Sequence, residues 1–209
     1  MNFNVIANKF KIFKKNNLVE NNNIDFKKIN LCCGSQKIPG YLGIDILPDS
    51  DIYLDLNNNN LPIVDNSVES LICMSAINYF SYKRAEEIIK EVYRILCSGG
   101  ITRFGVQDLE LISKLYVEKN FDFFFQKLSN GNERFEGETL GDKYVAWFYG
   151  YNASGNCCKY FFDYDSLYNI FKKAGFSIIE KKEYMNSRLE NIDYIDNRPE
   201  QMFYLEAIK

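Results

Sequence analysis

Short apolar runs that end in small or acidic residues mark the first part of the chain. An apolar run at residues 29–33 stops at Gly34-Ser35. A second run, at 41–44, follows a Pro39-Gly40 turn and closes on Asp45. Two short strands of this kind are typical of the nucleoside-binding edge of a parallel sheet. Apolar runs of strand type recur along the chain and predict strands at 28–33, 42–46, 51–56, 70–74, 101–106, 176–183 and 202–208.

Helical spacing of apolar residues appears between the later strands. It predicts an amphipathic helix within residues 1–20 and further helices at 82–96, 109–118 and 165–174. Ser98-Gly99-Gly100 is expected to end the second helix as a glycine cap, and Gly175 to end the last. Strands that alternate with helices predict one α/β sheet. No repeat or linker divides the chain, so we expect residues 1–209 to form a single domain.

The connections between the first strands are unusually short. Parallel neighbours usually need a crossover of about a dozen residues or more, commonly a helix. Only about eight residues separate the first two strands, and fewer separate the second from the third. The first crossovers are therefore expected to be abbreviated to loops.

Residues 120–160 differ from the rest of the chain because aromatic side chains crowd them and glycines punctuate them. Sugar rings stack on aromatic faces, and tyrosine hydroxyls can bond to sugar hydroxyls. The segment therefore suits an aromatic-rich insertion or a lid over a bound ligand, with Tyr149 and Tyr151 among its candidates. The alternative is that the rings fill a second small core.

Composition limits the partners and the location. A net charge of −3 and a pI near 5.2 argue against a nucleic-acid binder. No apolar run approaches the ~18 residues that span a bilayer. The first residues do not resemble a signal peptide. We expect a cytoplasmic protein with no membrane or nucleic-acid partner, which could form a homodimer.

The chain contains six cysteines and no histidine. None of the cysteines forms a C-x-x-C pair, so no metal site is expected. Adjacent cysteines bridge poorly, and those in apparent strands behave as small apolar residues. Reduced thiols are predicted.

The glycine pattern argues against a nicotinamide dehydrogenase. A dinucleotide fingerprint needs G-x-G-x-x-G after the first strand. Here Cys32-Cys33-Gly34-Ser35 supplies one glycine, and no helix clearly follows.

Four segments in order point to another family. They are INLCCGSQKIPGYLGID at 29–45, LDL at 54–56, LPIVDNSVESLICMS at 61–75 and EVYRILCSGGITRFGVQDLE at 91–110. Together they resemble class I S-adenosylmethionine-dependent methyltransferases. More narrowly, the chain is similar to small predicted methyltransferases associated with cell-surface polysaccharide synthesis. The resemblance covers about residues 28–118 and implies a Rossmann-like methyltransferase sheet, mostly parallel with an antiparallel C-terminal strand.

The resemblance implies a cofactor site for S-adenosylmethionine, with S-adenosylhomocysteine as product. Gly34 would let the backbone pass close to the cofactor. Asp45 would accept the ribose hydroxyls, with a turn cap before Pro48 as the alternative. Asp55 and Leu56 would meet the adenine, unless they are an ordinary strand end. The remaining cofactor-binding candidates are Asn30, Cys32, Ile46, Met74 and Ser75.

Two departures from the family concern the chemistry. Cys32 replaces the family's first glycine and narrows the space beneath the methionine part of the cofactor. Residues 75–79 replace a run that carries two histidines and a glutamate in the family, so no role can be carried over from them.

A base must therefore come from a carboxylate or a tyrosine. Asp108 is the first candidate, because it follows a strand at the carboxyl edge of the sheet. Its alternative role is the N-cap of the helix from Leu109. Residues 120–160 would then form an acceptor-binding lid, and the acceptor-binding candidates are Tyr79, Tyr149, Tyr151 and Lys159. Lys159 and Arg134 could each meet a phosphate, or could be solvated surface residues.

The expected activity is methyl transfer to a small hydroxylated acceptor, such as a sugar, a nucleotide sugar or a sugar-linked group of surface polysaccharide. The alternative is a catalytically inactive cofactor-binding or scaffold protein with the same fold. The departure at Cys32 and the missing histidines motivate that alternative.

Overall fold

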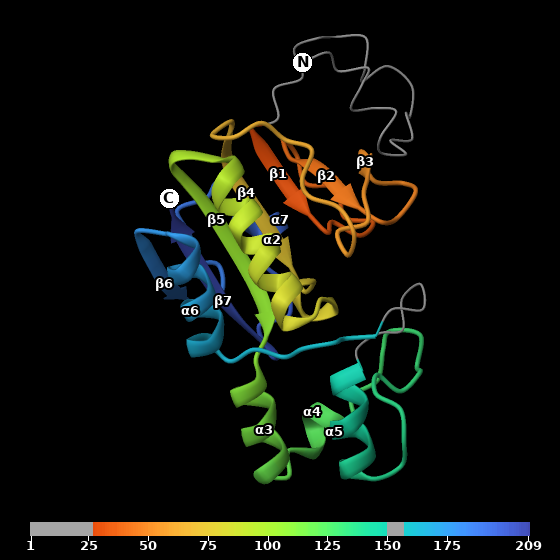
Figure 1. The fold of residues 1–209 in the computed structure, drawn as a ribbon. Coiled ribbons are helices and arrows are strands. Elements are labelled where there is room, and N and C mark those ends of the chain that lie inside the picture. Colours follow the sequence, from red (N-terminus) through yellow and green to blue (C-terminus); the bar gives the residue numbers. More distant parts are fainter. Residues whose placement is uncertain (1–26, 150–156) are drawn as a thin grey trace.

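The computed structural model describes residues 27–149 and 157–209 (Figure 1). The helix predicted within residues 1–20 lies outside these ranges. A seven-stranded sheet has the order β3-β2-β1-β4-β5-β7-β6. The strands are β1 Lys28–Leu31, β2 Leu42–Asp45, β3 Ile52–Tyr53, β4 Val68–Met74, β5 Leu96–Gln107, β6 Ile178–Lys182 and β7 Met202–Ile208.

The strand directions follow from the pairing. All neighbours from β3 to β5 are parallel, and Asn30 of β1 lies opposite Gly43 of β2 and Ile72 of β4. Strand β7 is antiparallel to both β5 and β6. The prediction of a Rossmann-like α/β sheet, mostly parallel with an antiparallel C-terminal strand, is confirmed.

Two helices cover one face of the sheet. Helices α2 (Tyr82–Ile95) and α6 (Tyr164–Ala174) pack against each other there (Figure 1). The Ser81 side chain accepts a hydrogen bond from the Arg84 amide and so caps α2. Helix α6 ends at Gly175, which has the left-handed φ of 110° that glycine tolerates, and this confirms the predicted stop. The buried side of α2 consists of Ala85, Ile88, Ile89, Val92 and Ile95.

The opposite face is covered by a segment from late in the chain. Loops at 32–41 and 46–51 join the first three strands without a helix, which confirms the abbreviated crossovers. The step from β1 to β2 runs across the sheet in the direction opposite to the step from β4 to β5. A right-handed crossover helix after β1 would therefore lie on the face opposite α2. Helix α7 (Ile192–Ile195) lies on that face instead, where Ile195 and Ile38 belong to one apolar cluster.

A buried ion network fastens this segment to the sheet. Arg103 of β5 is fully buried, and its Nε and Nη2 donate to the two carboxylate oxygens of Asp196 at 2.7 and 2.6 Å. Glu206 of β7 is also fully buried and lies 3.5 Å from Arg103 Nη1. The guanidinium further donates to the backbone oxygens of Glu183 and Asn186. One side chain thus holds residues 183–196 against β5 and β7.

The expected third strand, 51–56, is too long. Strand β3 comprises only Ile52–Tyr53, which pair with Ile44 and Asp45. The Leu54 amide donates to the Asp45 carbonyl at 2.8 Å, after which the chain leaves the sheet. Burial of Leu54 and Leu56 away from the strand ladder explains the difference.

The glycine cap predicted at Ser98-Gly99-Gly100 is also wrong. Helix α2 ends at Ile95, and β5 begins at the next residue because Leu96 is buried beside Val68. The pairing then shifts from Leu96 with Val68 to Ile101 with Ser70. The glycines lie in this irregularity, where Gly99 has a φ of 77°.

Helices α3 (Leu109–Val117), α4 (Phe121–Phe124) and α5 (Leu140–Tyr149) form a separate group beside one end of the sheet (Figure 1). We call residues 109–149 the aromatic unit. Its core cluster consists of Ile112, Phe123, Phe124, Phe135 and Trp147. For these residues the structure shows the second small core that was the alternative to a lid. A lid function stays a prediction.

Two further expectations concern the cysteines and the helices. All six cysteines are free thiols, as predicted. Among residues 27–149 and 157–209, no helix combines the length and the apolar character needed to cross a bilayer.

Candidate functional site

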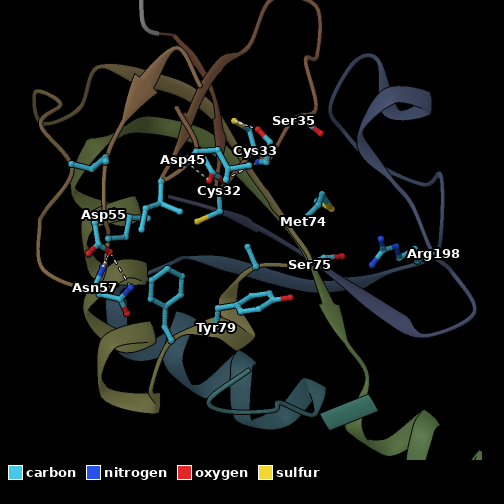
Figure 2. A pocket seen from close by; sticks show the side chains of 17 residues that line it. Cys32, Cys33, Ser35, Asp45, Asp55, Asn57, Met74, Ser75, Tyr79 and Arg198 are labelled. Atoms are coloured by element: carbon cyan, nitrogen blue, oxygen red, sulfur yellow. Dashed lines mark hydrogen bonds between the residues drawn. The ribbon is translucent and has the colours of Figure 1, made fainter. Parts of the chain in front are cut away.

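A cavity of about 480 Å³ opens at the carboxyl ends of β1, β2 and β4 (Figure 2). Open α/β sheets bind their ligands at this edge, and the volume lies within the ~300–1,000 Å³ typical of small-molecule sites. Its apolar wall includes Leu54, Leu56 and Phe80, all of them buried. The cavity therefore combines an apolar surface with the polar groups that end the strands.

Asp45 links the ends of the first two strands. Its Oδ2 accepts from the Gly34 amide at 2.8 Å, and its Oδ1 accepts from the Leu47 amide at 2.9 Å. The second bond is the turn cap that was the alternative role. A carboxylate offers about four lone-pair sites, so both oxygens can accept further hydrogen bonds. The turn cap and a ligand contact are therefore compatible.

Asp55 and Asn57 lie together at one end of the cavity (Figure 2). Asp55 Oδ1 accepts from the amide and the side chain of Asn57 at 2.8 and 2.9 Å, and Oδ2 accepts from Asn58 Nδ2 at 3.0 Å. Desolvation acts to raise the pKa of Asp55, but these bonds and the Lys159 charge outweigh it and hold the pKa below its ordinary value. Asp55 is thus an ionised acceptor at neutral pH.

Left-handed backbone surrounds the cavity. Cys32, Gly34 and Ser75 have φ values of 55°, 56° and 55°. A Cβ on Gly34 would meet no protein atom within 4 Å, so the backbone conformation explains this glycine. Cys32 has the same left-handed conformation, which explains why glycine suits this position in the family that the sequence resembles. The Cys32 side chain lines the cavity and occupies part of it.

The thiols at this edge are protonated. A hydrogen bond with Cys73, together with burial, raises the pKa of Cys32 well above its ordinary value. Burial, with the nearby Asp45 charge, raises the pKa of Cys33 to about 11. Since the thiolate is the reactive form of cysteine, neither residue is set up as a nucleophile at neutral pH.

The end of the cavity away from Asp55 is formed by Met74, Ser75, Tyr79 and Arg198 (Figure 2). Tyr79 belongs to the 3-10 helix η1 (Ile77–Tyr79), which follows β4. Its side chain forms a hydrogen bond with the Cys158 thiol. Arg198 comes from the turn before β7, so this end joins segments that are distant in sequence.

Most of the predicted cofactor residues lie together, and so does one predicted acceptor residue. The cavity is lined by Cys32, Gly34, Asp45, Ile46, Asp55, Leu56, Met74, Ser75 and Tyr79. Asn30 does not line it. Its buried side chain donates to the Gln36 carbonyl at 3.5 Å, beneath the loop that follows β1.

Asp108 serves as the N-cap of α3. Its Oδ1 accepts from the Leu111 amide at 3.1 Å, and its own amide donates to the Gln201 carbonyl. The side chain is buried and does not line the cavity. The geometry shows the cap, and the base role stays a prediction.

The other predicted acceptor residues lie apart from Tyr79. Lys159 Nζ donates to Asn57 Oδ1 at 3.0 Å, which places Lys159 at the Asp55 end. Tyr149 ends α5 with 59% exposure and does not line the cavity. Tyr151 lies outside the described residues. Arg134 is ion-paired with Glu200 at 3.1 Å and packs over Phe123 and Phe135, so its expected solvated role is wrong.

Several lining residues were not predicted from the sequence. They are Cys33, Ser35, Leu47, Leu54, Asn57, Ala76, Phe80 and Arg198. Most adjoin a predicted residue in sequence, so proximity to a strand end could have indicated them. Arg198 had no such signal, because only the folded chain brings its turn to this edge.

No protein-family model matches the chain, and no curated protein matches it. Among solved structures it is similar to an S-adenosylmethionine-dependent methyltransferase from Mesorhizobium loti, with 16% identity over 88% of this chain and 91% of that chain and a TM-score of 0.49. It is also similar to a methyltransferase from Methanosarcina mazei, with 18% identity over 87% of this chain and 91% of that chain and a TM-score of 0.49. A methyltransferase from Thermotoga maritima has 18% identity over 88% of this chain and 82% of that chain, with a TM-score of 0.48.

Proposed function

We propose that the protein is an S-adenosylmethionine-dependent methyltransferase. The observation that carries the proposal is the pair of carboxylates around one partly apolar cavity, Asp45 at the end of β2 and Asp55 just beyond β3. Asp45 has free acceptor capacity for ribose hydroxyls. Asp55 is ionised and can accept from an adenine amine, while Leu54, Leu56 and Phe80 offer apolar surface to the base.

The residues present fit this cofactor chemically. When bound, the cofactor supplies a methyl group on a strongly electrophilic sulfonium. The two carboxylates favour such a cationic ligand, since opposite charges attract across a partly buried site. The protonated thiols of Cys32 and Cys33 add no competing nucleophile. The main contribution of the protein is to hold donor and acceptor in line, which accounts for about 7–11 kcal/mol in favourable intramolecular models.

The acceptor we propose is a small hydroxylated molecule, a sugar or a sugar-linked group of surface polysaccharide. This part is supported by the sequence resemblance. Tyr79 and Ser75 offer hydroxyl groups at the end of the cavity away from Asp55. A hydroxyl acceptor placed there would have polar partners to orient it.

A second candidate is a protein that binds the cofactor without catalysis. It is favoured by the position of Asp108, which caps α3 and does not line the cavity. It shares the binding site with the first candidate and differs only in turnover.

Asp45→Asn tests the cofactor site. The wild type is expected to bind S-adenosylhomocysteine in a calorimetric titration. The variant should lose about tenfold or more in affinity, because hydrogen bonds to an ionised acceptor contribute about 1.5–3 kcal/mol. Asp49→Asn removes the same charge from an exposed turn residue that does not line the cavity, and should bind like the wild type.

Transfer of a labelled methyl group to members of a nucleotide-sugar panel then separates the two candidates. Turnover that Asp45→Asn lowers at subsaturating cofactor supports the enzyme, whereas binding without turnover supports the inactive protein. A folded wild type that binds neither S-adenosylmethionine nor S-adenosylhomocysteine contradicts both.

A further inference from the structure

We propose that Arg198 binds an anionic oxygen group, a carboxylate or a phosphate, of a ligand in the cavity. The inference rests on the proposed function, because it concerns the same site. Arg198 lies at the end of the cavity that Met74 and Ser75 form, away from Asp55 and Asn57 (Figure 2). Of the described residues that line the cavity, it is the only one with a positive charge.

The backbone on both sides of Arg198 is held in place. Two residues before it, Asp196 is fixed by the fork of hydrogen bonds from buried Arg103. Two residues after it, Glu200 pairs with Arg134 of the aromatic unit at 3.1 Å. The Gln201 amide also donates to the Arg198 carbonyl at 3.1 Å and closes a turn. A turn anchored to the sheet and to the aromatic unit presents the side chain at a defined place.

The conformation of Arg198 itself supports a function. Its φ of 54° is left-handed, which is uncommon for residues other than glycine. Such conformations persist where the surrounding structure fixes them, and they cluster at binding and catalytic sites. The turn thus keeps a long cationic side chain at a backbone position that glycine would fill at lower cost.

Charge identifies the ligand group. A guanidinium at the wall of the cavity attracts anionic groups of a ligand and repels cationic groups such as the sulfonium of the proposed donor. The planar guanidinium also matches carboxylates and phosphates through paired hydrogen bonds. An oxyanion on the ligand satisfies both conditions. It can come from the amino-acid carboxylate of the donor or from an acidic group of the acceptor.

Calorimetry on the full chain distinguishes the two sources. Wild type and Arg198→Gln are titrated with S-adenosylhomocysteine and with 5′-methylthioadenosine, which lacks the amino-acid part. Both proteins, saturated with S-adenosylhomocysteine, are then titrated with inorganic pyrophosphate. Lys90→Gln, an exposed α2 residue outside the cavity, is the control for loss of one positive charge, and thermal unfolding confirms that each variant is folded.

A loss of about tenfold or more for S-adenosylhomocysteine, with methylthioadenosine binding unchanged, supports the donor carboxylate as the anion. Unchanged S-adenosylhomocysteine binding with loss of pyrophosphate binding supports an acidic acceptor. Equal affinities of Arg198→Gln and wild type for S-adenosylhomocysteine, with no Arg198-dependent binding of pyrophosphate, overturn the inference and leave the proposed function standing. A wild type that does not bind S-adenosylhomocysteine overturns the proposed function, and the inference with it.

Discussion

At the scale of single residues, the ionisation of the Cys33 thiol at the edge of the cavity makes the stability of the fold depend on pH. Its side chain is buried at the end of β1, with Asp45 close by. Burial and the neighbouring negative charge both disfavour the thiolate. The folded state therefore retains a proton that the unfolded chain releases more readily.

We expect the free energy of unfolding to fall as the pH rises from about 9 to about 11. The unfolded thiol ionises near its ordinary pKa of 9.0, whereas in the folded protein the pKa of Cys33 is about 11. Above pH 9 the unfolded state thus binds fewer protons than the folded state. A rise in pH therefore stabilises the unfolded state relative to the folded state. Urea unfolding at pH 8, 9.5 and 10.5 measures the effect.

The matched variant for this prediction is Cys33→Ser, because serine does not ionise in this range. Its loss of stability with pH should be smaller than that of the wild type. Cys158, whose pKa burial also raises to about 11, should keep part of the dependence in the variant. Identical pH profiles for the two proteins would contradict the role of Cys33.

Residues of the site could be predicted where a local pattern marks them. Asp45 and Asp55 each adjoin a short apolar run, and the carboxyl ends of parallel strands meet at one edge. Arg198 could not be found in this way. It is an exposed arginine in a polar segment, and it lines the cavity only because tertiary contacts bring its turn there.

At the scale of elements, periodicity located the long elements but not the short ones. Helix α2 and strand β7 were predicted almost to the residue, because their apolar positions are regular over many residues. Helix α7 comprises only Ile192–Ile195 and has no pattern that a sequence can show. Its position depends on the buried contacts of Arg103, whose partners lie about 80 to 100 residues away in sequence.

Arg103→Leu is expected to destabilise the protein by about 3–5 kcal/mol, because it leaves the buried carboxylates of Asp196 and Glu206 without their central partner. Chemical denaturation monitored by circular dichroism measures this change. Lys27→Met, which removes a solvent-exposed ion pair with Glu69, should cost no more than about 1 kcal/mol. Similar losses for the two variants would contradict the central role of Arg103.

At the scale of the whole molecule, the aromatic unit is joined to the sheet at several points. Arg134 of the unit pairs with Glu200 before β7, and the Leu109 amide at the start of the unit donates to the Phe162 carbonyl at 3.2 Å. Phe162 follows Lys159, whose amide donates to the Asn78 carbonyl at 2.7 Å after β4. These links favour cooperative unfolding, and the single domain stays a prediction.

Trp147 offers a test, because it is the one tryptophan of the chain and is 4% exposed in the core of the aromatic unit. Its fluorescence reports that core, whereas far-ultraviolet circular dichroism reports the whole backbone. We expect the two signals to give the same denaturation midpoint, as two-state unfolding requires. An earlier fluorescence transition would show that the aromatic unit unfolds on its own.

The order of the strands also has a consequence for synthesis of the chain. Strand β7 follows all the other strands in sequence but lies between β5 and β6. As the chain leaves the ribosome, β5 and β6 are made before the strand that joins them, and Arg103 precedes both Asp196 and Glu206. The sheet therefore closes only after β7 has been made, and the cavity gains Arg198 only shortly before that strand. Until β7 pairs with β5, the nascent chain exposes the edge of β5, and chaperones can bind the chain during this interval.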